Sequence, residues 1–496
     1  MTGHFLDELL STFARQGTRQ ALVYRGRVLT YGELDALTER CAAWLQGLGV
    51  EPGDRVALSG ADKLTFLVCH LGTLRAGAVS LPLNPRFTRD ELRYFLADSG
   101  PKVAVMGEGH LPLAEALRPE IPELRAVVPD TAVGQAPEGK PRPVRVAADD
   151  PCFLFYSSGT TGWPKGVVHT HANVASALGA LRACWRVGAD DVVVNVLPLF
   201  HVHGLCFGSL LSLLAGACQL IEDSFHPLDT LDVIGRGTVF MAVPTIYYRL
   251  LGQPEFRAAA RAWKDLRLCT CGSAPIRPDV LPELEGILGR PVINRYGMTE
   301  AHVITSLPLD GPWPRGSVGT PLAGIEVRIT REDGGLTAPG EVGSVELRGP
   351  NLFREYWGRP DATRAAFATG WFETGDLGSR DADGFLTLVG RTNDLIITNG
   401  FNVYPQVVER VVNACPGVRE SAVLGVHDAR RGERVVAVVV RADAALDEGR
   451  LRAYWDERLV DYQRPREVVF VDALPRNAMG KVLRRELRDR IATGSA

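Results

Sequence analysis

The segment Tyr156–Gly166, which reads YSSGTTGWPKG, carries more information than any other stretch of this 496-residue chain. It combines glycines and hydroxyl side chains with one lysine, Lys165, and it follows an apolar run at Cys152–Phe155 that predicts a strand. Glycine lets a backbone approach a ligand closely, and backbone N–H groups, hydroxyls and a lysine together suit a bound polyanion. The spacing is not the G-x-x-x-x-G-K-[ST] pattern, because Pro164 precedes the lysine and Gly166 follows it. The segment therefore predicts a phosphate-binding loop that differs from the one in common kinases and GTPases.

The bulk properties indicate a globular protein with at least two domains. Apolar residues make up 46% of the chain and charged residues 23%, and the length exceeds that of one ordinary core. The net charge of -3 and the absence of a basic patch argue against a nucleic-acid partner. No apolar stretch is long enough to predict a membrane span, and the first residues lack the apolar region of a signal peptide. The nine cysteines are expected to be free thiols, so we expect a cytoplasmic protein.

Short apolar runs alternate with amphipathic stretches through most of the chain, which predicts an α/β fold with mostly parallel sheets flanked by helices. The runs expected to be strands are Arg55–Ser59, Ala78–Leu83, Lys102–Met106, Asp191–Leu197, Cys218–Ile221, Thr238–Val243 and Val292–Tyr296. After about Pro312 the pattern changes to turns and short strands, which predicts a β-rich subdomain. A small α/β unit is expected to follow Arg391.

Further segments contain residue types that suit a nucleotide. GSAP at Gly272–Pro275 follows an expected strand and leaves room for a flat ring, and RYGMTE at Arg295–Glu300 places a carboxylate among polar groups. WFETGDLG at Trp371–Gly378 contains Asp376, and PRNAMGK at Pro475–Lys481 ends on a lysine near the C-terminus. With the phosphate loop, and in this order along nearly the whole chain, these segments resemble those of the adenylate-forming (AMP-binding) superfamily, specifically its acyl-CoA synthetases.

The resemblance implies a set of ATP contacts. The phosphate-loop contacts would be Ser157, Ser158, Gly159, Thr160, Thr161, Gly162 and Lys165. The adenine site would comprise Gly272, Ser273, Ala274, Pro275, Tyr296 and Gly297, with Tyr296 stacking on the base. Asp376 and Arg391 would contact the ribose, Thr299 the α-phosphate, and Glu300 would hold Mg²⁺, since a carboxylate beside a phosphate needs a divalent cation between them.

The resemblance also implies a two-step reaction and a mobile small domain. Lys481 would screen the approach of a carboxylate to the α-phosphate, giving an acyl-adenylate and pyrophosphate. A small domain of residues 393–496 would then rotate on residues 1–392 about Asn393, remove Lys481 and bring Gly400 to the pantetheine arm of coenzyme A. The CoA thiol would displace AMP. Many relatives carry Gly or Lys where this chain has Asn399.

The acid is predicted by a different group of residues. PLFHVHG at Pro198–Gly204 matches the segment beside the substrate, with His201 at a gating position and His203 two residues further on. Arg249, about one turn into a helix that Thr245 is expected to cap, and Arg295 resemble the arginines that hold the distal carboxylate in malonyl-CoA synthetases. An arginine fork suits a carboxylate, so malonate or methylmalonate is the favoured substrate. Ala301-His302 after Glu300 depart from the malonate pattern, in which Thr or Ile is common.

Three alternatives remain open at this point. The chain could be a CoA ligase for a short- or medium-chain or aryl monocarboxylate. It could be a stand-alone adenylation enzyme that loads a carrier protein, or a nucleotide-binding regulator without activity. A monomer or a homodimer is expected, and the sequence does not decide between them.

Overall fold

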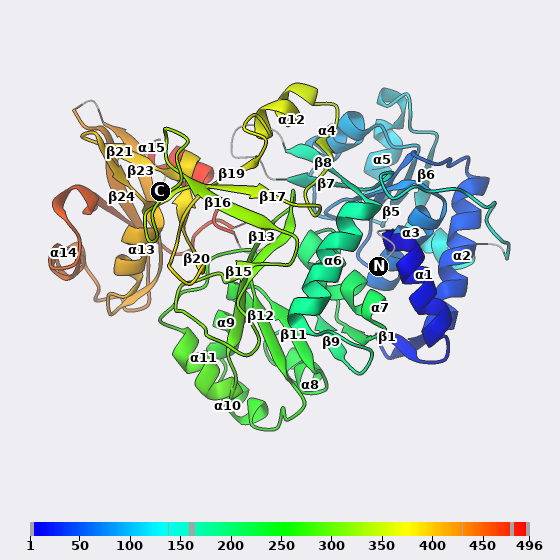
Figure 1. Ribbon diagram of the computed structural model, residues 1–496, viewed down its shortest axis with the longest axis horizontal. Coiled ribbons are helices and arrows are strands. Elements are labelled where there is room, and N and C mark those ends of the chain that lie inside the picture. The colour runs from blue at the N-terminus through cyan, green and yellow to red at the C-terminus, as the bar shows by residue number, and fades with distance from the viewer. Residues whose placement is uncertain (1–3, 137, 158–163, 429, 477–480, 493–496) are drawn as a thin grey trace.

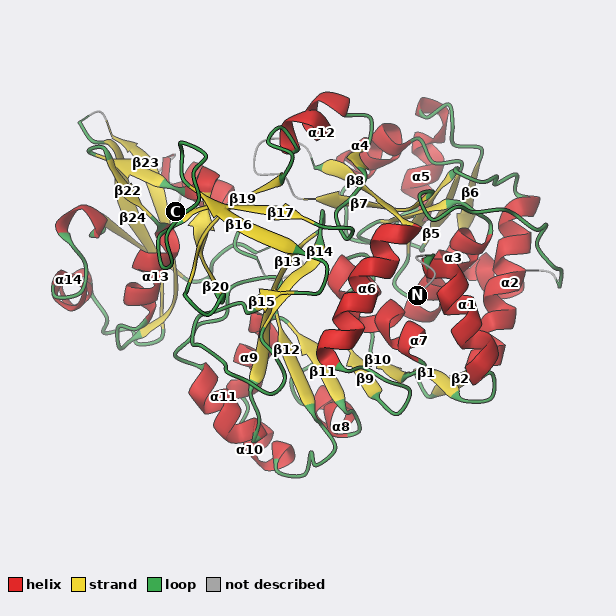
Figure 2. Cartoon of the chain, in the orientation of Figure 1, coloured by secondary structure: helices red, strands yellow, loops and turns green. Residues whose placement is uncertain are grey.

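The computed structural model describes residues 4–136, 138–157, 164–428, 430–476 and 481–492. Two large sheets are both built from the N-terminal part of the chain, and an antiparallel sheet and a small sheet lie toward the C-terminus (Figure 1). Helices pack between and around the sheets (Figure 2). The large N-terminal region of mainly parallel sheets, the β-rich subdomain and the small α/β unit confirm the expected fold class.

The first large sheet has seven strands in the order β18-β8-β7-β4-β3-β5-β6. Its strands are β3 (Arg55–Ser59), β4 (Val79–Pro82), β5 (Val103–Met106), β6 (Ala126–Pro129), β7 (Pro151–Ser157), β8 (Lys165–Thr170) and β18 (Glu355–Tyr356). Neighbours are parallel from β7 to β6, whereas β7, β8 and β18 pair antiparallel. The predicted strand before the phosphate loop is β7, and β8 leads out of that loop.

The second large sheet has nine strands in the order β15-β14-β13-β12-β11-β9-β10-β1-β2. Its strands are β1 (Gln20–Tyr24), β2 (Arg27–Thr30), β9 (Val192–Asn195), β10 (Cys218–Ile221), β11 (Val239–Ala242), β12 (Leu268–Cys271), β13 (Val292–Met298), β14 (His302–Ser306) and β15 (Thr320–Pro321). The central strands run parallel, and the antiparallel pairs lie at the two edges. Carboxyl ends of parallel strands meet at one edge of a sheet, so Gly272 after β12 and Tyr296 in β13 come close together.

Helices cover the two large sheets and share three buried apolar clusters with them. They are α1 (Phe5–Gln16), α2 (Tyr31–Gly47), α3 (Lys63–Arg75), α4 (Arg89–Ser99), α5 (Leu111–Leu117), α6 (His171–Trp185), α7 (Leu211–Ala215), α8 (Asp229–Gly235), α9 (Pro244–Leu251), α10 (Pro254–Ala260), α11 (Leu281–Leu288) and α12 (Pro360–Ala366). A π-helix, η3 (His203–Leu210), precedes α7, and the short 3₁₀ turns η1 (Arg118–Glu120) and η2 (Asp130–Gln135) flank β6. Capping boxes begin α2 at Thr30–Glu33 and α4 at Thr88–Glu91, which explains why these helices start where they do.

The β-rich subdomain and the C-terminal unit follow. The antiparallel sheet contains β16 (Glu326–Thr330), β17 (Gly343–Arg348), β19 (Phe372–Arg380) and β20 (Leu386–Arg391). After the 3₁₀ turn η4 (Thr392–Asp394) come β21 (Ile396–Thr398), β22 (Phe401–Val403), α13 (Pro405–Asn413), β23 (Val418–Asp428), β24 (Gly432–Arg441), α14 (Glu448–Asp456), η5 (Asp461–Gln463), β25 (Glu467–Val471) and α15 (Arg484–Ala492). The apolar residues after Ile396 form buried clusters of their own.

One sequence expectation changes in detail. The helix that carries Arg249 begins at Pro244 after the residue Val243, and no side-chain hydrogen bond caps it, so Thr245 is not its cap. Proline suits the first helical position because its fixed φ matches the helix and its missing N–H has no partner there in any case.

Among the described residues, every helix is too short or too polar to span a lipid bilayer. All nine cysteines are free, as expected.

Candidate active site

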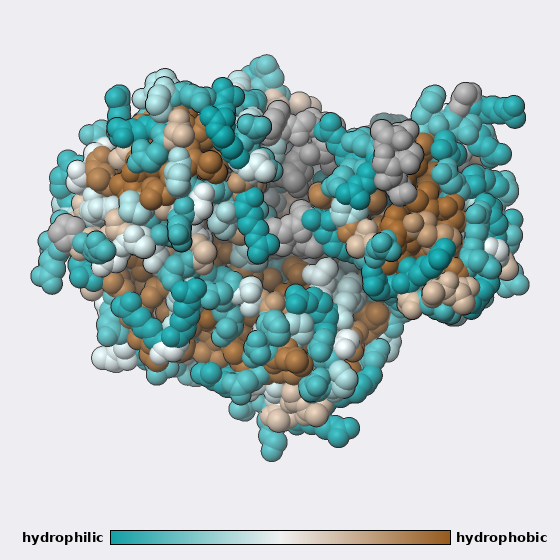
Figure 3. Space-filling view, turned by 180° about the vertical axis from the view of Figure 1, so that it is seen from behind, coloured by the Kyte–Doolittle hydropathy of each residue, from teal (hydrophilic) through white to brown (hydrophobic). Residues whose placement is uncertain are grey.

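A cavity of about 1010 Å³ lies where the small C-terminal unit meets the large domain. Seen from behind, the molecule is indented between its two lobes (Figure 3). The predicted site residues that line the cavity are Ser273, Ala274, Pro275, Arg295, Tyr296, Gly297, Asp376, Arg391, Asn393 and Lys481. Residues that are up to about two hundred positions apart in the sequence therefore line the same cavity, and both domains contribute to it.

The nucleotide side is organised around one buried carboxylate. The Tyr296 hydroxyl donates a close hydrogen bond to Asp376, and Arg391 Nε lies 2.9 Å from Asp376 Oδ1. The Asp376 backbone N–H donates to Thr374 Oγ1 at 3.0 Å within β19. A carboxylate accepts about four hydrogen bonds, so Asp376 keeps acceptor sites that hydroxyl groups of a ligand could use. The charge of Asp376 is already balanced by Arg391, so this side is complete before a ligand binds.

Lys481 reaches this side from the C-terminal unit. More than a third of its surface is exposed, and it is one of the residues that line the cavity. Packing around its ammonium nevertheless lowers the pKa of Lys481, Arg391 lowers it further, and Asp376 and Asp394 act in the opposite direction. Asp394 also pairs with Arg484 Nε at 3.7 Å, so η4 is tied to the start of α15. A partly desolvated ammonium beside Asp376 suits a group that must meet phosphate and carboxylate oxygens.

Glu300 is the buried carboxylate of the phosphate region. It is 6% exposed, the Tyr356 hydroxyl donates to its Oε1 at 3.2 Å, and burial raises the pKa of its carboxyl group while hydrogen bonds from Tyr356 and Ser157 oppose that rise. Among the described residues, no group of three or more His, Cys, Asp or Glu side chains could hold a metal ion alone. A single buried carboxylate whose side-chain hydrogen bonds come from the hydroxyls of Tyr356 and Ser157 fits Mg²⁺, which takes few ligands from protein and others from water and phosphate.

The phosphate loop is partly described. Ser157 ends β7 and pairs with Lys165 at the start of β8, and Lys165 Nζ lies 4.8 Å from the centre of the Tyr356 ring. The predicted contacts Ser158, Gly159, Thr160, Thr161 and Gly162 lie outside the described residues. The two ends of the loop thus come together beside Tyr356, which itself contacts Glu300.

The acid side contains a buried cation, Arg295, that has no carboxylate partner among the described residues. Arg295 is 4% exposed, and its guanidinium lies 5.0 Å from the centre of the Phe207 ring. Its Nη2 is 3.4 Å from Ser273 Oγ, and its Nε has no hydrogen-bond partner within the described part of the chain. Ser273 Oγ is also 3.1 Å from Nδ1 of His203. Burial lowers the pKa of His203, and the neighbouring Arg295 lowers it further, so His203 is neutral.

The other two predicted acid-side residues lie differently. His201 is half-buried beside Phe200, and burial lowers its pKa to about 4. Arg249 is exposed, and its guanidinium lies 4.9 Å from the centre of the Phe225 ring. Thr245 and Tyr248 of the same helix line the cavity, whereas Arg249 is not among the described residues that do so. The structure therefore brings His203, Ser273 and Arg295 together and places Arg249 apart from them.

Two glycines are required by close contacts rather than by flexibility. A Cβ on Gly272 would lie 2.4 Å from Arg295 Nε, because the guanidinium crosses the backbone at that point. A Cβ on Gly297 would lie 2.1 Å from the backbone oxygen of His302. In the C-terminal unit, Asn399 and Gly400 connect β21 to β22 with φ of 49° and 79°. Positive φ at both positions is typical of a two-residue type I′ hairpin, a conformation that Asn and Gly tolerate.

Sequence reasoning missed several residues that contact the motifs. Tyr356 donates a hydrogen bond to Glu300, and the ring of Phe207 packs against the guanidinium of Arg295. His169 and Asn351 donate hydrogen bonds to backbone carbonyls of the turn that contains Glu300. None of them belongs to a glycine-rich or charged motif, so no local pattern identifies them.

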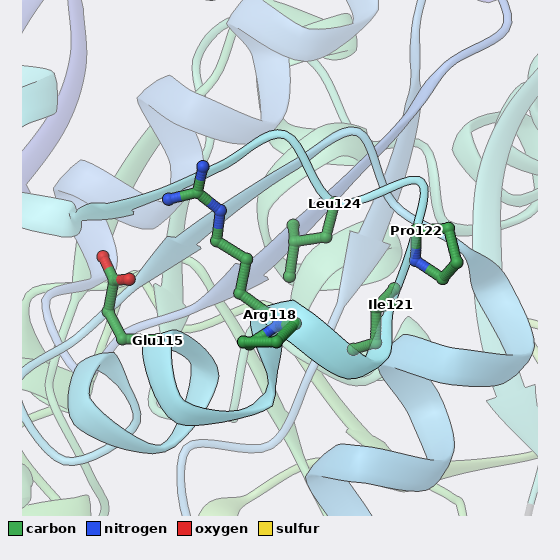
Figure 4. A pocket seen from close by; sticks show the side chains of 6 residues that line it. Glu115, Arg118, Ile121, Pro122 and Leu124 are labelled. Carbon is green, nitrogen blue, oxygen red and sulfur yellow. The ribbon is translucent and has the colours of Figure 1, made fainter.

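A second pocket of about 410 Å³ lies at η1 and includes Glu115 and Arg118, but it contains none of the motif residues (Figure 4).

The fold and the site define a class: enzymes that bind a nucleotide at the carboxyl ends of parallel strands and cover it with a small C-terminal domain. Comparison with known proteins agrees. The family model of AMP-binding enzymes matches residues 10–357, and that of the AMP-binding enzyme C-terminal domain matches residues 407–481. The chain belongs to the AMP-binding enzyme family.

Its relatives are ligases of coenzyme A. A feruloyl-CoA synthase of Amycolatopsis sp is 35% identical, with 95% of each chain covered, and an oxalate–CoA ligase of Arabidopsis thaliana is 35% identical, with 98% of each covered. The crystal structure of ATP-bound MatB from Rhodopseudomonas palustris is 37% identical and superimposes with a TM-score of 0.94 over 100% of both chains. The apo form of that protein gives 0.81. The chain is thus an acid–thiol ligase that uses ATP, Mg²⁺ and coenzyme A.

Proposed function

We propose that this enzyme activates a small dicarboxylate, malonate or methylmalonate, as its CoA thioester. The observation that carries the proposal is Arg295, a buried guanidinium that has no carboxylate partner among the described residues. An unpaired buried charge costs several kcal/mol, so proteins rarely keep one without a use. The distal carboxylate of a dicarboxylate would supply the missing counter-charge.

The neighbours of Arg295 support an anion of small size. Ser273 Oγ lies near both Arg295 and His203, so it can donate to a carboxylate that enters between them. Phe207 closes the other face of the guanidinium. Charged hydrogen bonds contribute about 1.5–3 kcal/mol each, and a site built on them can reject an analogue without the charged group by ~10⁴-fold.

The chemistry divides between the two sides of the cavity. Arg295 and Ser273 would hold the distal carboxylate, so the other carboxylate points toward the nucleotide side. Lys481 would screen the repulsion between that carboxylate and the α-phosphate and stabilise the charge that develops as pyrophosphate leaves. Mg²⁺, held by Glu300, would neutralise phosphate charge. In the second half-reaction, residues 393–496 would turn about Asn393 and place Gly400 along the thiol arm of coenzyme A.

One observation favours a monocarboxylate instead. The ring of Phe207 lies 5.0 Å from the guanidinium of Arg295, and a desolvated cation–π contact contributes about 2 kcal/mol. That contact compensates part of the buried charge without any ligand. The relatives do not decide the question, because those named for ferulate and for oxalate are equally similar to this chain.

The experiment is a panel of acids measured by pyrophosphate release with free coenzyme A. Malonate, methylmalonate, oxalate, propionate, hexanoate and benzoate cover both hypotheses. We expect kcat/KM for malonate or methylmalonate to exceed that for propionate by at least ~10³-fold. A preference for propionate, hexanoate or benzoate would show that Arg295 is a structural cation and that the dicarboxylate proposal is wrong. Adenylation without thioester formation would indicate a carrier-protein acceptor.

A further inference from the structure

The turn between β13 and β14 is held from outside by three hydrogen bonds. Each of its three successive carbonyls accepts one: Thr299 from His169 Nε2 at 2.7 Å, Glu300 from the Phe353 N–H at 2.8 Å, and Ala301 from Asn351 Nδ2 at 2.6 Å. A hairpin turn normally leaves such carbonyls to solvent. Here two buried side chains and one backbone group from other segments take them.

The geometry of His169 defines what that side chain does. A carbonyl oxygen only accepts, so Nε2 of His169 must carry the proton. His169 is fully buried, and burial lowers its pKa to about 4. The ring is therefore neutral, in one tautomer, over the working range of pH. It acts as a fixed donor to the Thr299 carbonyl.

Asn351 has the same function on the other end of the turn. It is 1% exposed, and its amide donates to the Ala301 carbonyl. The segment that carries it is itself anchored, since Asn173 Nδ2 donates to the Pro350 carbonyl at 2.9 Å. The turn thus lies between β8 on one side and the 350–353 segment on the other.

These contacts connect two parts of the phosphate region. His169 lies on β8, the strand that begins at Lys165 where the phosphate loop ends. Tyr356 of β18 pairs with Val167 of the same strand and donates to the Glu300 carboxylate. A shift of β8 would therefore move Lys165 and the Glu300 turn together.

We propose that His169 and Asn351 are positioning residues that fix the orientation of the Glu300 carboxylate before Mg²⁺ and ATP bind. The proposal rests on the role of Glu300 as the metal ligand. With the carbonyls of Thr299 and Ala301 both hydrogen-bonded, the turn is held in one orientation. The binding of Mg²⁺ and ATP then loses no free energy to ordering the turn. Without the donor on His169, the Thr299 carbonyl loses its partner and the turn can rotate away from the metal.

The test uses a matched pair of buried histidines. His169→Leu removes the donor, His169→Gln returns an N–H at a similar distance, and His171→Leu serves as the control. His171 is buried two residues further on and stacks on His4 with ring centres 4.6 Å apart, but within the described part of the chain it makes no hydrogen bond to the turn. Each protein is titrated calorimetrically with a non-hydrolysable ATP analogue, once with saturating Mg²⁺ and once with EDTA.

We expect His169→Leu to weaken binding about tenfold with Mg²⁺ and less than twofold in EDTA, because only the metal depends on the orientation of Glu300. His169→Gln should recover most of the affinity, and His171→Leu should bind like the unchanged protein. Asn351→Ala should repeat the metal-dependent loss. An equal loss in EDTA, an equal loss in His171→Leu, or no loss at all would overturn the proposal. No acid enters this experiment, so its outcome is independent of the proposed substrate.

Discussion

The two sides of the cavity differ in how they balance charge. On the nucleotide side, Asp376 is paired with Arg391 and hydrogen-bonded to Tyr296. On the acid side, Arg295 has an aromatic face and one serine hydroxyl but no carboxylate among the described residues. The first arrangement is stable without a ligand. The second would be completed by an anion, as we propose, so the acid side should determine substrate choice while the nucleotide side determines rate.

The largest expected effect is on the nucleotide side. Lys481→Ala removes the cation that screens carboxylate and phosphate, so acyl-adenylate formation should fall by about 10²–10³-fold. ATP–pyrophosphate exchange measures this step alone. Thioester formation from chemically prepared acyl-adenylate should change little, because Lys481 is expected to leave the site in that step. An equal loss in both half-reactions would contradict the division of roles between Lys481 and Gly400.

On the acid side, Arg295→Met should lower kcat/KM for malonate by ~10²-fold, the value of one or two charged hydrogen bonds. Methionine keeps an apolar side chain against Phe207 and removes a desolvated charge, so the melting temperature should not fall. The activity with propionate should be unchanged or higher. The proposal fails if malonate and propionate lose activity to the same extent.

The nucleotide side should also respond to alkaline pH. The pKa of Lys481 is lowered from the ordinary value of 10.5, chiefly by burial, so its ammonium loses the proton at a lower pH than a free lysine. The active form is the cation, and activity is therefore present below the shifted pKa and lost as pH rises through it. The kcat/KM for ATP in the exchange reaction should fall about tenfold per unit above that pKa. A profile that stays flat to pH 10.5 would argue against this role of Lys481.

The nucleotide side could be predicted from sequence because its contacts lie within contiguous motifs. Tyr296, Asp376 and Lys481 each belong to a segment with unusual composition, and the structure places them around one cavity. Tyr356 could not be found in this way, since it meets Glu300 from 56 positions away and belongs to no motif. The same applies to His169, whose partner Thr299 lies 130 positions further along the chain.

The acid side shows where sequence patterns lose precision. The resemblance to malonyl-CoA synthetases predicts Arg295 as a substrate residue, and the structure places it in β13, where it lines the cavity. Arg249 lies on a helix, where one position turns a side chain by about 100°. Tyr248 therefore lines the cavity while Arg249 points toward Phe225. The helix start at Pro244 and the direction of each side chain depend on packing that the sequence pattern does not record.

The smallest effect is expected at Arg249. Comparing its variant with that of Arg295 shows whether one arginine or both bind the acid. Arg249→Met keeps contact with Phe225 and removes an exposed charge, so kcat/KM for malonate should fall by only a few-fold, against ~10²-fold for Arg295→Met. Loss of an exposed cation–π contact costs about 0.5–1 kcal/mol, which is a small change in stability. The two variants are measured side by side with malonate and propionate. If Arg249→Met lowers malonate activity as much as Arg295→Met and leaves propionate unchanged, then Arg249 must leave Phe225 when the acid binds, and both arginines hold the distal carboxylate.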